Sequence, residues 1–244
     1  MGTHYTIGYL AQWACIMMEQ NSEDTSSNLV ELPLFPLNLV LFPGMRLPLH
    51  IFEERYKTMI SDCIRRETPF GVLLIKQGLE AGGPAEPFRI GTTARITQNT
   101  QLEGGRLNIL TIGEKRFELV DVVSSTPFMI GNIRFLREEQ GEVSEHLLIE
   151  IREEYETFLK QLATVAGGWN RTIEVPTDSS TLDRDVIATM ASSIELSTSL
   201  RQEILEDPQV KRRLDRLLPL LKQGNELMQE KVEDSNPFKG SRLN

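Results

Sequence analysis

Cysteine and histidine are scarce in this chain of 244 residues, which has two cysteines and three histidines. Two thiols cannot build a disulfide framework or a four-thiolate zinc site. His4, His50 and His146 lie far apart and form no H-E-x-x-H motif or cysteine/histidine cluster. We therefore expect no metal and no other cofactor, and the few thiols fit a reducing cytoplasm.

Basic residues are also fewer than acidic residues. The chain has 26 Lys and Arg against 35 Asp and Glu, which gives a formal net charge of -9 and a pI near 5.0. Such a surface repels phosphate backbones and anionic lipid unless a basic patch is segregated. The basic residues are instead mixed with acids, as in "DPQVKRRLDR", which is typical of a solvated helix face. We expect neither a nucleic-acid partner nor a membrane partner.

Long apolar runs of the kind that cross membranes are missing too. The N-terminal run from Tyr5 to Met18 is shorter than the about 20 residues that a bilayer requires. It also lacks a preceding positive region and an obvious cleavage site, so it is a poor signal peptide. Polar "EQNSEDTSSN" follows it. We expect residues 1–28 to be a disordered extension, or the product of a misassigned start, outside the folded domain.

The stretch "LPLFPLNLVLFPGMRLPLHIF", from Leu32 to Phe52, is apolar but contains four prolines. A proline inside a helix costs about 3 kcal/mol, so a helix is excluded here. The alternating leucines instead predict short strands, with the prolines at edges and bends. Within "FPGM", Pro43 and Gly44 suit a type II turn, which requires a positive φ at the glycine.

In "IFEERYKTMISDCIRRE" the spacing of the apolar residues changes to that of a helix. Cys63 lies on the apolar side, which favours a small buried residue over a nucleophile. The predicted helical stripe comprises Phe52, Tyr56, Met59, Ile60 and Cys63.

Strand signals recur from Phe70 to about Leu136, with "EGGR" as a hairpin connection, and predict a small closed or nearly closed β-barrel.

The second half of the chain is predicted to be helical from about Glu142. Ser180 with Asp183 resembles a capping box, and Asp207 before Pro208 resembles an N-cap followed by proline at the first helical position. Pro219 should kink the last helix or end its regular hydrogen bonding. One amphipathic stripe comprises Leu148, Ile151, Tyr155, Phe158, Leu159 and Leu162.

The expected fold class is therefore α+β, with one helix inserted early in the barrel. The expected parts are a β-barrel over residues 29–138, a helical subdomain over residues 142–230 and a loose tail over residues 231–244.

Several stretches resemble one family. They are "ELPLFPLNLVLFPGMRLPLHIFEERYKTMI", "FGVLLI", "GRLNILTIGEKRFELV" and "LRQEILEDPQVKRRLDRLLPLL". From about Glu31 to Leu221 the chain is similar to the N-terminal substrate-binding domain of Lon proteases. That resemblance implies a PUA-like β pseudo-barrel followed by a helical bundle, and recognition of damaged or unfolded protein. The motif residues, to which we assign structural roles, are Phe35, Pro36, Phe42, Pro43, Gly44, His50, Phe52, Glu53, Arg55 and Tyr56.

The catalytic parts of Lon are not matched. The sequence contains no G-x-x-x-x-G-K-[ST] phosphate loop, no G-x-S-x-G and no S-x-x-K. We expect the chain to end before an ATPase or a Ser/Lys protease module could begin, as in stand-alone bacterial Lon-domain proteins. We therefore predict no catalytic residues and no enzymatic activity.

The leading hypothesis is a non-catalytic protein-recognition module that binds unfolded or exposed apolar segments. It would serve as an adaptor to a protease or chaperone in protein quality control, as a cytoplasmic monomer or weak homo-oligomer. A hydrolase with a dispersed Ser/His/Asp site is the alternative, and RNA binding through the PUA-like fold is a weaker one.

Two motif positions have a functional and a structural interpretation. For His50 we favour a hydrogen-bonded histidine that joins strand to helix over a catalytic base. For Glu53 and Arg55 we favour a local salt bridge, or docking onto a neighbouring strand, over a recognition pair.

Overall fold

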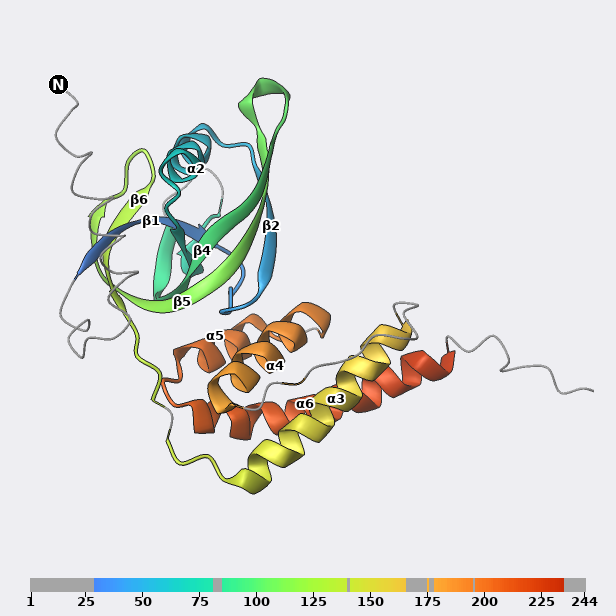
Figure 1. Cartoon of the computed structure of the whole chain (residues 1–244). Coiled ribbons are helices and arrows are strands. Elements are labelled where there is room, and N and C mark those ends of the chain that lie inside the picture. Colours follow the sequence, from blue (N-terminus) through green and yellow to red (C-terminus); the bar gives the residue numbers. More distant parts are fainter. Residues whose placement is uncertain are drawn as a thin grey trace, which may run out of the picture. The chain divides into compact units, whose positions relative to one another are not determined.

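The computed structural model describes residues 29–80, 85–139, 141–165, 175, 178–194 and 196–234. The chain divides after Arg137 into a β unit and a helical unit (Figure 1). This arrangement confirms the predicted α+β class. The predicted N-terminal extension, residues 1–28, lies outside the described residues.

The β unit is one sheet in the order β2-β5-β4-β3-β1-β6. Because β5 also pairs with β6, five of the strands close on themselves and β2 is added beside β5. β1 runs parallel to β3, and the other neighbouring strands are antiparallel. The strands are β1 (Val30–Leu37), β2 (Arg46–Ile51), β3 (Phe70–Gly78), β4 (Ala85–Gln101), β5 (Leu107–Ser124) and β6 (Met129–Phe135).

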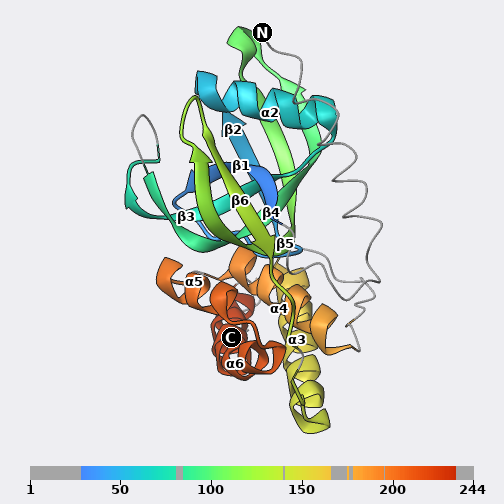
Figure 2. The same cartoon turned by 90° about the vertical axis from the view of Figure 1, so that its left-hand side faces the viewer.

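The side chains of β1 divide between two apolar cores. Leu32 and Leu34 are fully buried in one of them. Phe35 and Leu37 belong to the other, which α2 (Glu54–Arg66) covers. Figure 2 shows α2 lying across the strands of this unit. Since side chains alternate along a strand, Glu31 and Pro33 share the face of β1 that carries Phe35 and Leu37. The first core comprises Val30, Leu32, Leu34, Leu73, Phe117, Leu119 and Ile133.

The turn between β1 and β2 forms as the sequence predicts. Met45 N–H donates to the carbonyl of Phe42 at 3.1 Å, and Gly44 has φ 83°. The turn is attached to β5, because Gly44 N–H donates to the Gly113 carbonyl at 2.9 Å. The predicted "EGGR" connection between β4 and β5 contains a short 3-10 turn, η1 (Glu103–Gly105).

The apolar stripe of α2 consists of Tyr56, Met59, Ile60 and Cys63, all of them buried. The assignment of Phe52 to this stripe was wrong, because its side chain is 56% exposed. Phe52 follows the last residue of β2 and precedes the first turn of α2, so the helical period does not apply to it.

The helical unit contains α3 (Glu145–Val165), α4 (Ser179–Ser193), α5 (Thr198–Glu206) and α6 (Val210–Asp234). α3 and α6 lie side by side (Figure 1), and polar contacts join their flanks. Lys222 Nζ lies 2.6 Å from Glu150 Oε1, and Asn225 Nδ2 donates to Glu154 Oε2 at 2.6 Å. α6 continues to Asp234, so the chain is still helical at the start of the predicted tail.

One of the predicted helix signals is corrected by the structure. The N-cap of α4 is Asp178, which accepts from Thr181 N–H at 2.8 Å, so Ser180 of the predicted capping box lies inside the helix and is not its N-cap. Asp183 is instead buried beside Arg213, because its position in α4 faces α6.

The predicted signals of α6 are used in part. Asp207 Oδ1 accepts from Gln209 N–H at 3.0 Å, as expected of a cap, although the helix begins only at Val210. Pro219 lies inside α6 and does not end it. The proline is exposed, so water can satisfy the carbonyl that it leaves free, while Leu217 and Leu221 remain buried on the inner side.

Among the described residues, none of the helices combines the length and apolar character that a bilayer crossing would require.

Candidate functional site

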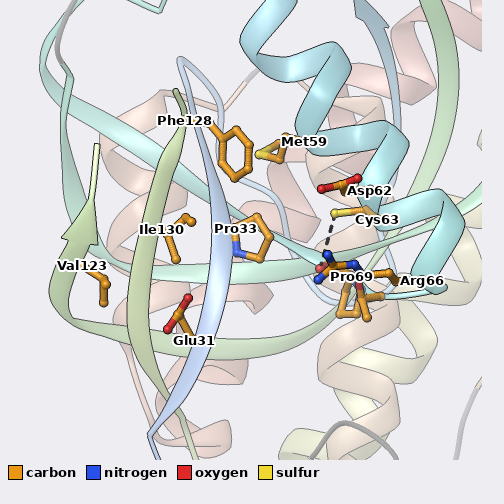
Figure 3. A pocket seen from close by; sticks show the side chains of 11 residues that line it. Glu31, Pro33, Met59, Asp62, Cys63, Arg66, Pro69, Val123, Phe128 and Ile130 are labelled. Carbon is orange, nitrogen blue, oxygen red and sulfur yellow. Dashed lines mark hydrogen bonds between the residues drawn. The ribbon is translucent and has the colours of Figure 1, made fainter. Parts of the chain in front are cut away.

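Two pockets lie in the β unit along α2, where the helix crosses the sheet. The wide pocket has a volume of about 430 Å³ and borders the second half of the helix (Figure 3). The narrow pocket has a volume of about 150 Å³ and borders its beginning. The wide pocket is lined by Glu31, Pro33, Met59, Asp62, Cys63, Arg66, Thr68, Pro69, Val123, Phe128 and Ile130.

The wide pocket follows from the register of β1 and β6. Leu32 and Leu34 point into the barrel core, so Pro33 between them points toward the helix side. Pro33 is the direct antiparallel partner of Ile130, and this pair forms one wall. Met59 and Cys63, four residues apart on one side of α2, form the facing wall (Figure 3).

Charged residues of both signs line this apolar pocket. Glu31 lies at one end of it, and Phe128 and Met59 lie at the other (Figure 3). Asp62 and Arg66 extend from α2, and Asp62 forms an ion pair with Arg65. With both signs present, the lining gives no strong preference for an anion or a cation, and apolar side chains are the ligand that it suits.

Cys63 is the thiol in the wall of the wide pocket. Its side chain is buried, and this burial raises the pKa of the thiol to about 12. The Sγ atom donates a weak hydrogen bond to the Pro69 carbonyl at 4.0 Å (Figure 3). A protonated thiol is a poor nucleophile, so Cys63 is the small buried residue that the sequence predicted.

The narrow pocket brings together five of the ten predicted motif residues, which come from β1, β2, the short connection between β2 and α2, and α2 itself. Phe35 and Tyr56 stack in its wall, with ring centroids 3.9 Å apart. Burial raises the pKa of Tyr56, although the nearby charge of Arg55 acts to lower it. The motif residues that line this pocket are Phe35, His50, Phe52, Glu53 and Tyr56.

His50 lies in β2 and is exposed. Its Nδ1 atom is 2.7 Å from Asn108 Oδ1, so the histidine joins β2 to β5. The expected link from strand to helix is therefore corrected to a link between strands, because the antiparallel register places His50 opposite Asn108. The narrow pocket is lined by no serine, threonine or cysteine that His50 could activate.

Glu53 and Arg55 form the predicted local salt bridge. Arg55 Nε lies 3.0 Å from Glu53 Oε2, and Arg55 Nη2 donates to the Glu80 carbonyl at 3.4 Å. The guanidinium also lies over the Tyr56 ring, 4.5 Å from its centroid. Arg55 therefore holds the start of α2 against the segment that follows β3.

The remaining motif residues line neither pocket. Pro36 pairs in register with Leu73, and Phe42 is almost fully buried and accepts the hydrogen bond of the turn. Pro43 and Gly44 form the bend itself.

Sequence reasoning did not single out the residues that β6 and the end of β5 bring to the wide pocket. Ile130, and Phe128 just before β6, reach it because β6 pairs with β1, and Val123 of β5 reaches it because β5 pairs with β6. No local motif marks them, and the strand pairing had to be known first.

The described part of the chain contains no group of three or more His, Cys, Asp or Glu side chains that could hold a metal ion. Within the lining of the wide pocket there is also no histidine to act as a base.

Comparison with known proteins agrees with this fold. Residues 31–223 match the substrate-binding domain of the ATP-dependent protease La (LON). The chain belongs to this family. The matched region is the substrate-binding part of Lon and not a catalytic one.

Relatives and solved structures give the extent of the similarity. The Lon protease of Anaeromyxobacter dehalogenans is 25% identical over 215 residues, which cover 86% of this chain and 25% of that protein. The crystal structure of a Lon N-terminal domain protein from Xanthomonas campestris has a TM-score of 0.58 at 24% identity, and the match covers 78% of this chain and 98% of that one.

The N-terminal domain of a Mycobacterium avium complex Lon protease has a TM-score of 0.54 at 19% identity, covering 79% of this chain and 98% of that one. These two structures share the fold. The chain spans about a quarter of the length of the curated Lon relative from Anaeromyxobacter.

Proposed function

We propose that this domain is a non-catalytic recognition module that binds exposed apolar segments of other proteins in the wide pocket. The observation that carries the proposal is an apolar pocket of about 430 Å³ between α2 and the β1–β6 pair, in a member of a substrate-binding family. In the cell it would act in the cytoplasm, as a monomer or weak homo-oligomer and as an adaptor in protein quality control.

The pocket has the size and chemistry for a few apolar side chains. Its volume lies in the range of about 300–1,000 Å³ that is usual for ligand pockets. Fully burying one large apolar side chain contributes about 1.5–3 kcal/mol. Two or three such side chains supply about 3–9 kcal/mol before association costs, so the about 8 kcal/mol of a micromolar complex also requires contacts outside the pocket.

Apolar side chains in the pocket lining and just before β1 are exposed to solvent. Val123 in its lining is 52% exposed, and Leu29, just before β1, is 44% exposed. Exposed apolar groups beside a pocket are what a protein-recognition surface requires.

The proposal is tested by titrating the full chain with a reduced, unfolded model protein and with single-stranded RNA, each at low and high salt. We expect micromolar binding of the unfolded protein that depends weakly on salt, and no comparable binding of RNA. Strong RNA binding that collapses with salt would contradict the proposal and support the nucleic-acid alternative. Binding to neither ligand would contradict general recognition of unfolded chains and leave only a dedicated partner.

A matched pair of variants assigns the binding to the wide pocket. Val123 lines it, whereas its neighbour Val122 is similarly exposed, at 45%, and does not. Val123→Arg should weaken binding of the unfolded protein about tenfold or more, because it removes one buried contact worth about 1.4 kcal/mol and puts a charge in its place. Val122→Arg should bind like the unmodified chain. Equal effects of the two substitutions would place the binding surface elsewhere.

The same preparations serve to test the absence of catalysis. Incubation with ATP and with casein should give no turnover. Hydrolysis that stays with the chain through rigorous purification would support the hydrolase alternative.

A further inference from the structure

The strand β1 changes its partner in the middle of its length. Residues 30–34 pair with β6, whereas residues 34–37 pair with β3. A strand inside a sheet has a neighbour on each side, but no described strand pairs with residues 30–33 on the side where β3 would continue. The first half of β1 therefore has an open edge, without a partner strand.

The two prolines of β1 indicate which backbone groups face this open edge. Successive residues of a strand direct their N–H and C=O groups to opposite sides, and a proline fits where its nitrogen faces no partner strand. Pro36 fits with its nitrogen toward the β6 side, because pairing with β6 ends at Leu34, and Pro33 fits with its nitrogen toward the open edge. Both placements agree with a single alternation along β1. The N–H and C=O of Glu31 and the C=O of Pro33 are therefore directed at the open edge.

The open edge borders the wide pocket. Pro69, just before β3, lines the pocket on the side of β1 where the edge is open, and Ile130 lines it on the other side (Figure 3). Glu31 and Pro33 line it from β1 itself. A strand added to the edge places every second side chain on this face of the sheet. The pocket and the edge can therefore hold the same ligand.

We propose that a client segment binds in the wide pocket as an added β-strand along the open edge of β1. The segment carries a basic side chain opposite Glu31 and an apolar side chain two residues away on each side of it. This inference rests on the proposed function, because it specifies the conformation and the chemistry of the segment that the same pocket receives.

Glu31 supplies the charge that favours a basic residue. Its half-buried carboxylate forms no ion pair with another described residue, whereas Asp62 in the same lining pairs with Arg65. Opposite charges directly across from each other on neighbouring strands stabilise strand pairing. The preference is local to Glu31, because Arg66 in the same lining comes from α2 and not from a strand beside the edge.

Apolar surface lies on both sides of Glu31 along β1. Leu29, two residues before it, is 44% exposed. Pro33, two residues after it, forms the pocket wall that faces Met59 and Cys63. An apolar side chain opposite each of these positions is therefore removed from water, and the three alternating side chains of the client match the three residues of β1 on this face.

An unfolded client has the free backbone groups that this pairing requires. A helix satisfies its own N–H and C=O groups and would leave those of Glu31 without a partner. Backbone hydrogen bonds are the same for every residue except proline, so strand addition accepts segments of many sequences. These bonds also supply contacts beyond the apolar side chains, which a micromolar complex requires.

The first measurement titrates the full chain with labelled peptides of about nine residues, centred on Leu-Thr-Lys-Thr-Leu, and follows fluorescence anisotropy. N-methylation removes N–H donors either at the Leu and Lys positions or at the two Thr positions. Because alternate N–H groups of an added strand face β1, one set should weaken binding about tenfold or more and the other less than about twofold. The sensitive set also gives the direction of the added strand. Equal effects of the two sets, or a peptide that does not bind when the unfolded protein does, would overturn the proposal.

The second measurement tests the basic residue by charge reversal. Glu31→Lys should weaken binding of the lysine peptide about fivefold, and exchanging the lysine of the peptide for glutamate should restore it. Glu103→Lys is the matched control, because it makes the same change in net charge at an exposed residue outside the pocket lining. It should leave binding unchanged. Equal weakening by both substitutions would contradict the placement of the basic residue opposite Glu31.

The proposed function and the strand addition can fail separately. If the unfolded protein binds and Val123→Arg abolishes this binding, but N-methylation acts equally at both sets of positions, the function stands and the strand addition falls. If neither the peptides nor the unfolded protein bind, both proposals fall.

Discussion

Phe35 of β1 and Tyr56 of α2 stack with their ring centroids 3.9 Å apart and their planes inclined by 26°. Pro33 and Met59 line the wide pocket. Phe35 is the next residue after Pro33 on the same face of β1, and Tyr56 lies about one helical turn before Met59 in α2, so the stacked rings are next to the wide pocket on both elements. The same two rings line the narrow pocket. Both pockets therefore depend on this contact between the helix and the sheet.

Removing the ring of Phe35 should loosen α2 from the sheet. Phe35→Ala is expected to lower the free energy of unfolding by about 3–5 kcal/mol, because a buried aromatic residue is lost and a cavity remains. Chemical denaturation followed by circular dichroism measures the change. Phe52→Ala is the control, since that ring is 56% exposed, and it should stay within about 0.5 kcal/mol of the unmodified chain.

The turn at Gly44 should not accept a β-branched residue. Its φ of 83° is one that L-residues seldom adopt, so Gly44→Val is expected to cost on the order of 1–3 kcal/mol. Gly44→Asn tests the cause, because asparagine tolerates positive φ and should be less harmful. A neutral Gly44→Val in thermal unfolding would contradict the turn assignment.

The helical unit should depend on Arg213, which is only 5% exposed. Its Nε lies 2.9 Å from Asp183 Oδ2, its Nη1 donates to the Asp207 carbonyl at 2.7 Å, and it also pairs with Glu138. Arg213→Leu is expected to cost about 3–5 kcal/mol, because the buried Asp183 carboxylate loses its counter-ion.

Arg216 on the same helix provides the matched control for this substitution. It is exposed, and its Nη1 lies 3.7 Å from Glu203 Oε2, so Arg216→Leu should change stability by less than about 1 kcal/mol. Urea denaturation followed at 222 nm compares the two variants. Equal losses of stability in the two variants would show that burial of the Arg213 ion pairs does not account for the effect of Arg213→Leu.

The cap of α4 should make stability depend on pH. The hydrogen bonds donated to Asp178 by Thr181 lower the pKa of this carboxyl group below its ordinary value. The stabilisation is therefore complete above the ordinary pKa of about 4, and is lost as the pH falls through the lower pKa of the folded state.

Asp178→Ala is expected to cost about 1 kcal/mol at pH 7, as is usual for loss of an N-cap. The difference between this variant and the unmodified chain should shrink below pH 4. Thermal unfolding at pH 7 and pH 3 measures it, with Asp178→Asn as the control that retains an acceptor but does not titrate. A difference that is constant over this pH range would exclude the carboxylate as its source.

Deleting residues 1–28 should leave the fold intact, because the family match begins at residue 31. For a chain of this size, 1 kcal/mol of stability corresponds to roughly 2–4 °C in melting temperature. A drop of more than about 10 °C would show that the segment is part of the core.

Local patterns predicted the features that local chemistry controls. The turn at Phe42–Met45 formed because proline and glycine restrict the backbone wherever they occur. The stripe of Tyr56, Met59 and Cys63 followed from the helical period, and the sequence also ordered the strands before the helices. Phe52 was wrongly assigned to the helical stripe because it lies between a strand and a helix, where neither the two-residue period of the strand nor the 3.6-residue period of the helix applies.

Contacts between distant segments could not be predicted in the same way. Asp183 was interpreted as part of a cap from its neighbours in sequence, whereas its partner Arg213 is 30 residues away in α6. His50 was expected to join strand to helix, and the register of β2 against β5 places Asn108 opposite it instead.

The sequence by itself determined the family, the division into strands followed by helices, and the absence of a local catalytic or metal motif, since these depend on the order and spacing of residues. Only the tertiary structure decided where a ligand could bind. The wide pocket exists because β6 pairs with β1 and places Ile130 beside Pro33, with Met59 of α2 lining the same space. Strand pairing and the packing of a helix on a sheet are set by the burial of side chains far apart in the sequence, which periodicity within one segment does not encode.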